Sequence, residues 1–261
     1  MENVRRKKPL IHCITNVVVT NFTANGLLAI GASPVMAYAK EEVKDMVRMA
    51  DALLLNIGTP DQMLVEAMIL AGKAANKAGV PVVFDPVGAG ATPYRTGISK
   101  RILDEVNITV LRGNSGEIAS LLGETADVRG VDGTTALDPA ALAQKAARAF
   151  STVAAVTGEV DVVSDGNRIK MVQNGHPWMA KVVGTGCLLG AVISAFVAVG
   201  DNVINDAANA LATYGVVGEI AYESSSAKGI GSFQEAFLNG LSTVSDADVK
   251  KMAKISSVEP R

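Results

Sequence analysis

Cysteine and aromatic residues are scarce in this chain of 261 residues, which has two cysteines and 4% aromatic residues. Cys13 and Cys187 lie far apart, so the sequence has neither a disulfide framework nor zinc-ligand spacing, and we expect a reducing, cytoplasmic setting. The net charge of −2 offers no basic excess for nucleic acid or an anionic membrane surface. Residues 1–10 contain Arg5-Arg6-Lys7-Lys8 without the apolar run of a signal peptide, and we interpret them as a solvated leader.

Two common nucleotide-binding motifs are also missing. No G-x-x-x-x-G-K-[ST] run occurs, which excludes a P-loop site. Gly184-Thr185-Gly186 begins like the dinucleotide motif G-x-G-x-x-G, but leucine stands at position 189 and the segment follows a predicted hairpin late in the chain. A Rossmann oxidoreductase is therefore not expected.

The uncharged, strongly apolar stretch at residues 182–200 raises the question of a membrane span. Its first five residues have the pattern of a loop, and the remaining helix is too short to cross a hydrocarbon core of roughly 30 Å. The turn Gly184–Cys187 before this apolar helix is either a tight structural loop or an anion site built from free N–H groups and the positive helix end.

Short apolar segments alternate with helical patterns along most of the chain, which indicates an α/β fold with a mostly parallel sheet covered by helices on both faces. We predict extended segments at 10–14, 34–36, 52–57, 80–84, 108–111 and 152–156, and helices at 20–30, 40–49, 61–78, 98–106 and 139–150. A polar loop at 127–135 and a hairpin of 160–164 with 168–172 are expected, followed by helices at 186–199, 203–222 and 232–242. No linker divides residues 1–261, so we expect one domain.

Polar residues end three of the predicted strands, in Asn56-Ile57-Gly58, Asp85-Pro86 and Arg112-Gly113-Asn114. Ligands of such sheets bind beyond the carboxyl ends of the strands, so we expect these residues on one rim. Arg112 either extends to solvent or offers its planar guanidinium to a phosphate. Thr157 is either a turn hydroxyl or a phosphate or ribose contact.

Two acidic residues on this rim allow two interpretations each. Asn114 and Glu117 have the N-x-x-E spacing of a helix capping box, yet Glu117 could hold a metal-bound water near phosphates. Asp85 is either a turn residue before Pro86 or a second acid for magnesium. The capping box explains Asn114 and Glu117 fully and is the favoured interpretation of that pair, but two acids on the same rim as a glycine-rich anion site give the functional interpretation more weight.

Cys187 lies in the first turn of the apolar helix, where the dipole is expected to lower a thiol pKa. Either a small side chain simply fits there, or the thiolate accepts the hydroxyl proton of a substrate. Met36 is either a core residue or a polarizable wall for a heterocycle. His12 is expected to be a hydrogen-bonded core histidine, and Cys13 inert packing.

Several segments, taken together and in order, resemble the hydroxyethylthiazole kinase family of the ribokinase-like superfamily. They are His12–Asn16, Gly31–Met36, Asn56–Thr59, Asp85–Ala89, Arg112–Glu117, Val156–Gly158 and Gly184–Cys187. The cysteine is especially informative, because most ribokinase-like small-molecule kinases resemble this turn but have aspartate in place of Cys187. One mild departure is Gly229-Ile230-Gly231-Ser232-Phe233, where the family usually has G-P-G-S-F.

The resemblance implies a ribokinase-like fold and ATP-dependent phosphorylation of 4-methyl-5-(2-hydroxyethyl)thiazole, with magnesium, in thiamine salvage. It also implies a homotrimer with substrate sites between subunits. The roles it implies are thiazole contacts for Met36 and Gly184, ATP contacts for Arg112 and Thr157, magnesium and phosphate contacts for Asp85 and Glu117, pocket shaping for Asn16 and Gly58, and a general base in Cys187. A weak base is tolerable because a loose phosphoryl-transfer transition state asks mainly for positioning and charge stabilisation.

Three alternatives remain open from the sequence. One is a related kinase acting on another small alcohol, such as the thiamine pyrimidine. A second is a nucleotide-dependent hydrate dehydratase, which would have aspartate in place of Cys187. The third is a non-catalytic sensor that binds the thiazole or a nucleotide without releasing ADP.

Overall fold

The computed structural model describes residues 1–124 and 138–258, so the loop predicted at 127–135 lies outside the described residues. The strands are β1 (Leu10–Ile14), β2 (Ser33–Val35), β3 (Ala52–Asn56), β4 (Val82–Asp85), β5 (Val110–Asn114), β6 (Val153–Thr157), β7 (Asp161–Ser164), β8 (Ile169–Val172) and β9 (Ile255–Val258). They form one sheet in the order β2-β1-β3-β4-β5-β6-β7-β8-β9. The strands from β2 to β6 are parallel, and β7, β8 and β9 are added antiparallel.

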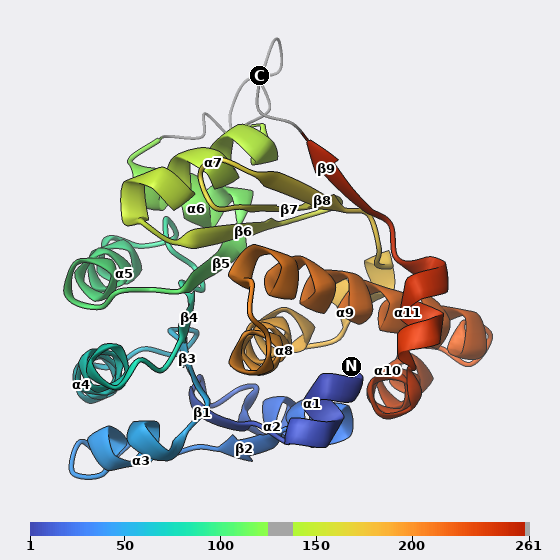
Figure 1. Ribbon diagram of the computed structural model, residues 1–261, viewed down its shortest axis with the longest axis horizontal. Coiled ribbons are helices and arrows are strands. Elements are labelled where there is room, and N and C mark those ends of the chain that lie inside the picture. The colour runs from blue at the N-terminus through green and yellow to red at the C-terminus, as the bar shows by residue number, and fades with distance from the viewer. Residues whose placement is uncertain (125–137, 259–261) are drawn as a thin grey trace.

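Helices cover both faces of this sheet, as Figure 1 shows. They are α1 (Glu2–Lys7), α2 (Thr20–Ile30), α3 (Val43–Met49), α4 (Gln62–Ala78), α5 (Pro93–Glu105), α6 (Ser115–Leu122), α7 (Pro139–Phe150), α8 (Thr185–Val199), α9 (Val203–Ser225), α10 (Ile230–Thr243) and α11 (Asp246–Met252), with a short 3-10 helix η1 at Pro177–Lys181. The prediction of a mostly parallel sheet between two helical layers is confirmed.

The central strands are apolar throughout because they are buried on both faces. In β3, Leu53 and Leu55 pack in the core under α3 to α7, whereas Ala52 and Leu54 face the opposite core under α2, α8, α9 and α10. All four side chains are fully buried. Successive strand residues point to opposite faces, so an unbroken apolar run is what a doubly covered strand requires.

Helix α8 lies at the centre of one helical layer, where it contacts β1, β3 and β4 as well as α2 and α9. The helix has fifteen residues, most of which are buried in the protein core. This agrees with the prediction that the segment is a core helix and not a membrane span. No helix within residues 1–124 and 138–258 is both long and apolar enough to cross a membrane.

Three segments depart from the sequence predictions. Residues 2–7 are helix α1 rather than a solvated leader, because Val4 is buried and the Arg5 guanidinium donates to the carbonyls of Leu241 and Ser242 at 3.2 and 2.9 Å. Helix α5 begins at Pro93, five residues before the predicted start, with the Thr92 hydroxyl capping it. Helix α11 and strand β9 were not predicted.

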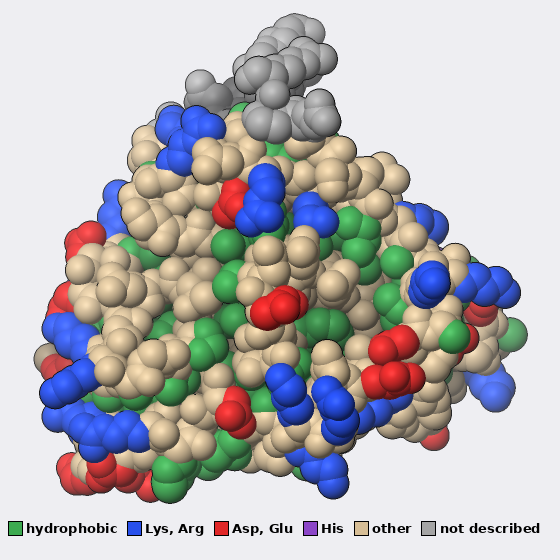
Figure 2. All heavy atoms as spheres, in the orientation of Figure 1, with side chains coloured by type: hydrophobic (Ala, Val, Ile, Leu, Met, Phe, Trp, Pro, Cys, Tyr) green, Lys and Arg blue, Asp and Glu red, His purple; other side chains and the backbone are tan. Residues whose placement is uncertain are grey.

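Basic and acidic side chains are interspersed on the face shown in Figure 2, without a large area of one sign. This distribution agrees with the small net charge of −2. The expectation of no nucleic-acid partner rests on the same absence of a basic surface, and it stays a prediction.

Candidate active site

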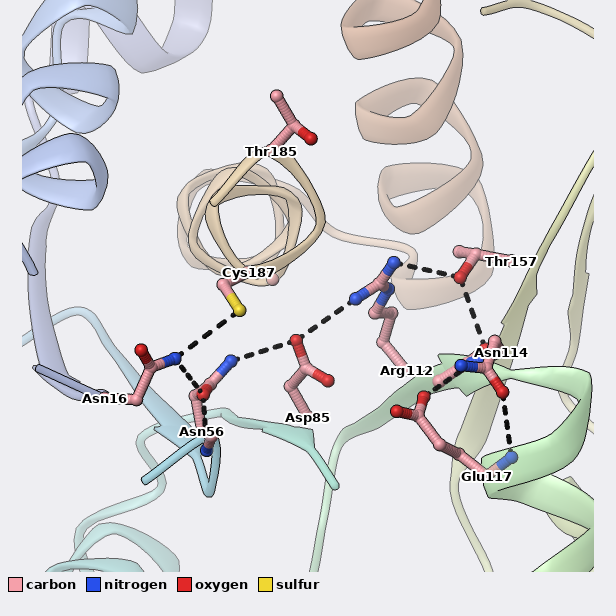
Figure 3. A network of polar contacts seen from close by, with 12 residues as sticks. Asn16, Asn56, Asp85, Arg112, Asn114, Glu117, Thr157, Thr185 and Cys187 are labelled. Atoms are coloured by element: carbon pink, nitrogen blue, oxygen red, sulfur yellow. Dashed lines mark hydrogen bonds and ion pairs between the residues drawn. The ribbon is translucent and has the colours of Figure 1, made fainter. Parts of the chain in front are cut away.

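The carboxyl ends of the parallel strands carry a continuous polar network (Figure 3). The Asn16 amide donates to Asn56 Oδ1 at 2.8 Å, and the Asn56 amide donates to Asp85 Oδ2 at 3.1 Å. From the other side, Arg112 donates to the same Asp85 oxygen at 3.1 Å and to Thr157 Oγ1 at 2.9 Å. The prediction that polar strand ends meet on one rim is therefore confirmed.

Asp85 is the fully buried carboxylate of this network. Burial raises the pKa of Asp85 to about 6, because removal from water outweighs the attraction of the Arg112 guanidinium. Its Oδ2 accepts from Asn56 and Arg112, while its Oδ1 is buried with no hydrogen-bond partner among the described residues. A buried acceptor left unpaired is costly, which marks Oδ1 as an atom available to a ligand, a water or a cation.

Arg112 does not extend to solvent, so that interpretation of the sequence is wrong. Its side chain is 13% exposed, and its guanidinium bridges Asp85 and Thr157. A Cβ placed on Gly186 would lie 3.8 Å from both terminal nitrogens of Arg112. The guanidinium is thus directly below the first turn of α8, at one end of a cavity.

The glycine turn before α8 depends on Gly184, whose φ is +95°. A side chain there would be strained by this backbone and would also meet Val19 and Phe22 at 3.1 and 3.0 Å. Leu188 is the first helix residue whose N–H reaches back to the Gly184 carbonyl, at 2.8 Å. Within the described residues no hydrogen bond is found for the N–H groups of Gly186 and Cys187, which leaves them free for an anion beside Arg112.

Cys187 is half-buried at the start of α8, and its Sγ lies 3.5 Å from the Asn16 amide nitrogen. The expected lowering of its pKa by the helix dipole is wrong: burial, together with the nearby Asp85 carboxylate, raises the pKa of the Cys187 thiol. The donors Asn56 and Asn16 and the Arg112 charge oppose this rise without overcoming it. The thiol therefore keeps its proton near neutral pH, and in that form it is not available as a general base.

Glu117 forms the capping box that its spacing with Asn114 predicts. Asn114 Oδ1 accepts from the Glu117 N–H, and Glu117 Oε2 accepts from the Asn114 N–H at 2.8 Å. Glu117 Oε1 also accepts from the Gly88 N–H at 2.8 Å, which ties the loop after β4 to α6. This structural use leaves the role in phosphate or magnesium binding untested.

The remaining predicted residues are not among those that line this cavity. Met36 is partly buried against the core around α8. Gly58 lies against Asn16, whose amide nitrogen would be 2.4 Å from a Cβ on Gly58. His12 is a core histidine as predicted, with Nε2 at 2.8 Å from the Ala37 carbonyl, and Cys13 is fully buried.

A cavity of about 920 Å³ opens from Arg112, Thr157 and Gly186. This volume is within the range of small-molecule sites. Its walls include residues that sequence reasoning missed, namely Asp161, Leu211, Tyr214 and the segment 173–177. Asp161 carried a weak signal as an acidic residue that begins the strand after the Thr157-Gly158 turn, but nothing in the sequence brings α9 and the end of β8 to the same cavity.

The fold defines a class of protein. A ribokinase-like superfamily protein from Enterococcus faecalis V583 aligns with 89% of this chain and 86% of its own, with a TM-score of 0.65 at 14% identity. That likeness shows the fold alone, and the described strands and helices have the arrangement of a ribokinase-like α/β protein.

More similar proteins narrow this class. Residues 1–247 match the model of the hydroxyethylthiazole kinase family. A hydroxyethylthiazole kinase from Shouchella clausii is 59% identical over 259 residues, which cover 99% of this chain and 100% of that protein. The solved structure of a hydroxyethylthiazole kinase protein from Pyrococcus horikoshii OT3 has a TM-score of 0.90 at 46% identity, covering 99% and 97% of the two chains. The chain belongs to the hydroxyethylthiazole kinase family.

Proposed function

We propose that this protein transfers the terminal phosphoryl group of ATP to the primary hydroxyl of 4-methyl-5-(2-hydroxyethyl)thiazole, as a thiamine-salvage kinase. Family membership supports the reaction. The observation that carries it is the meeting of two kinds of anion donor at one end of the cavity, the free N–H groups of Gly186 and Cys187 and the Arg112 guanidinium below them. Fixed donors of this kind stabilise the charge of a transferring phosphoryl group.

Phosphoryl transfer forms a bond between the thiazole alcohol oxygen and the phosphorus, and it breaks the bond to the ADP oxygen. In a loose transition state the hydroxyl proton is still largely in place and passes to an oxygen of the transferred phosphoryl group as the new bond forms, so positioning matters more than a strong base. The raised pKa of Cys187 fits this requirement. We assign most of the catalysis to the N–H groups of the glycine turn, and a minor share to Cys187 as a polar contact for the alcohol.

Magnesium is the cation we assign to this reaction, and the described residues fit an ion held largely by phosphate and water. Among them, no three His, Cys, Asp or Glu side chains form a metal centre. Asp85 nevertheless presents the unpaired buried oxygen Oδ1, and Glu117 lies close enough to influence the pKa of Asp85. Mg²⁺ usually keeps several waters and takes one or two carboxylates plus phosphates. When bound, it would neutralise charge on the phosphates, with Asp85 and Glu117 as its protein partners.

A homotrimer with sites between subunits is the assembly we propose. Its support on this chain is an apolar surface beside the glycine turn, where Val17, Val18 and Val183 are 77, 64 and 70% exposed. Val19 borders Gly184, so these valines surround one edge of the site. A Val183→Lys variant should lose the trimer in light scattering, whereas Met49→Lys, an equally exposed apolar residue at the end of α3, should retain it.

Two broader proposals follow from the same features. The described strands all belong to one sheet, and this supports a single kinase domain over residues 1–261. Neither cysteine forms a disulfide, and this supports a cytoplasmic location.

An ADP-release assay with a panel of alcohols and magnesium tests the function. We expect turnover with the thiazole alcohol and little with the thiamine pyrimidine alcohol. Preference for the pyrimidine would indicate a different kinase of the same fold. Stabilisation by the thiazole without any ADP release would indicate a sensor and would contradict the proposed reaction.

A further inference from the structure

We propose that Asp161 binds the ribose hydroxyls of the nucleotide and thereby fixes the direction in which the nucleotide lies in the cavity. This inference rests on the proposed use of ATP and adds a specificity-determining residue to the nucleotide site.

Three neighbouring strands line the cavity in succession. Strand β6 ends at Thr157, strand β7 begins at Asp161, and Asp161 pairs with Val172 at the end of β8. Because β7 lies between β6 and β8, Asp161 lies between Thr157 and the segment 173–177 that continues from β8. The carboxylate thus occupies the middle of the cavity wall, one strand away from each end.

The two ends of the cavity have different chemistry. At the β5 and β6 end are Arg112, Thr157 and the free N–H of Gly186, which are donors suited to phosphates. On the other side of Asp161 the walls include Gly175, His176 and Pro177, whose ring and backbone surfaces suit a flat heterocyclic base, whereas Tyr214 donates to the Thr185 carbonyl beside the donor end. A nucleotide with its phosphates at the donor end would place its sugar beside the middle strand, at Asp161.

The Asp161 carboxylate is prepared to accept hydrogen bonds there. Its Oδ1 already accepts from the Gly158 N–H at 3.0 Å, which holds the side chain in place. Its Oδ2 has no hydrogen-bond partner among the described residues, and it is accessible from the cavity that Asp161 lines. Hydroxyls can donate to it, and a vicinal diol offers two donors.

The negative charge also explains why this position does not suit a phosphate. A carboxylate repels phosphate oxygens, so Asp161 directs the phosphates toward Arg112. Burial raises the pKa of Asp161 to about 6, despite the Gly158 N–H and the Arg112 charge, so the group is ionised at neutral pH. Asp161 therefore separates the phosphate end from the base end.

The test compares Asp161→Asn with the wild-type protein, using calorimetric binding of ATP and of 2′,3′-dideoxy-ATP in the same magnesium buffer. Asparagine can keep the Gly158 contact through its own oxygen, but it presents an amide where Oδ2 accepts. The matched control is Asp201→Asn, which removes an exposed aspartate between α8 and α9. We expect the wild type and the control to bind ATP about 10- to 100-fold more tightly than the dideoxy nucleotide, as hydrogen bonds to charged groups predict.

In Asp161→Asn this preference should fall to within about threefold, through weaker ATP binding and unchanged dideoxy-ATP binding. An equal loss for both nucleotides, or no preference in the wild type, would overturn the proposal. A higher magnesium requirement with either nucleotide would show that Asp161 is a metal ligand instead. These binding measurements need no turnover, so they test the role of Asp161 separately from the kinase reaction. A wild type that binds ATP but releases no ADP with the thiazole alcohol would refute the proposed kinase reaction and leave the proposal for Asp161 standing.

Discussion

Nη1 of Arg112 lies 3.1 Å from Oδ2 of Asp85, and the two side chains are 13% and 1% exposed. Because both side chains are largely removed from water, the attraction between the two charges offsets the free-energy cost of burying each of them. Breaking a buried pair on one side leaves an uncompensated charge, which typically costs about 3 to 5 kcal/mol. Arg112 is thus a structural partner of Asp85 as well as a candidate phosphate ligand.

Arg112→Ala is expected to lower the free energy of unfolding by about 3 kcal/mol and to weaken ATP binding. In Arg112→Ala with Asp85→Asn, much of the stability should return, because no charge is left unpaired, while ATP binding should stay weak. Urea unfolding and calorimetry measure the two effects separately. Thiazole binding without ATP should be nearly unchanged in the single variant, and its loss would contradict the assignment of Arg112 to the nucleotide.

The control for this comparison is Arg101→Ala. Arg101 pairs with Glu105 one helical turn away on α5, with side chains 50% and 30% exposed. Such exposed pairs contribute about 0.3 to 0.5 kcal/mol. A cost at Arg112 as small as the cost at Arg101 would mean that the buried pair does not stabilise the site.

Gly58→Ala is expected to disrupt the polar network, because the new Cβ would meet the Asn16 amide at 2.4 Å. That amide contacts both Asn56 and Cys187. We expect kcat to fall at least about tenfold, the cost of one misplaced contact to the reacting groups. Steady-state ADP release measures the effect.

Gly97→Ala provides the matched control, because Gly97 is exposed within α5 and nothing lies within 4 Å of its Cβ position. Alanine should stabilise this helix by about 0.5 to 1 kcal/mol and leave kcat unchanged. If Gly58→Ala raised the melting temperature and kept full activity, as Gly97→Ala should, the position of Asn16 would not matter to the reaction.

The parts of this fold that the sequence predicts are those in which local pattern and tertiary burial agree. Leu53, Leu54 and Leu55 form an unbroken apolar run, and a strand covered on both faces is what such a run requires. The capping box of Asn114 and Glu117 is likewise set by four adjacent residues. Thr92-Pro93, a cap followed by a first-turn proline, is also a local signal and marks the start of α5 five residues before the predicted one.

The features that could not be predicted depend on contacts between distant segments. Strand β9 exists through its pairing with β8, and α1 through the hydrogen bonds of Arg5 to the end of α10. The same holds for the pKa of Cys187. Its place in the helix start is visible in the sequence, but its burial near Asp85 is not, and burial outweighs the Asn56 and Asn16 contacts and the Arg112 charge that would lower the pKa.

Cys187→Ser is expected to retain activity within about tenfold of the wild type, because the raised pKa keeps the thiol protonated and leaves the transition state to the N–H donors. Gly184→Ala, which strains a backbone at φ +95° and meets Val19 and Phe22, should cost at least about a hundredfold. ADP release under saturating substrates measures both. Equal losses in the two variants would show that Cys187 contributes as much as the whole turn.

Asp161 and Asp165, at opposite ends of β7, are expected to give opposite pH dependences of stability. For Asp161 the native pKa is raised from 3.8 to about 6, so the native state binds more protons and wild-type stability falls as pH rises from about 4 to 6. Asp161→Asn lacks this loss, and its free energy of unfolding should improve relative to the wild type by about 1 to 3 kcal/mol over that range.

For Asp165, burial is outweighed by donors from Arg168 and Asn167, which lower its pKa. Its contribution is therefore present above the unfolded pKa of 3.8 and lost as pH falls below it, so Asp165→Asn should become less stable than the wild type as pH rises through that value. Urea unfolding over a series from about pH 2 to pH 7 compares the variants, and differences that move in the same direction with pH would contradict the opposite environments of the two carboxylates.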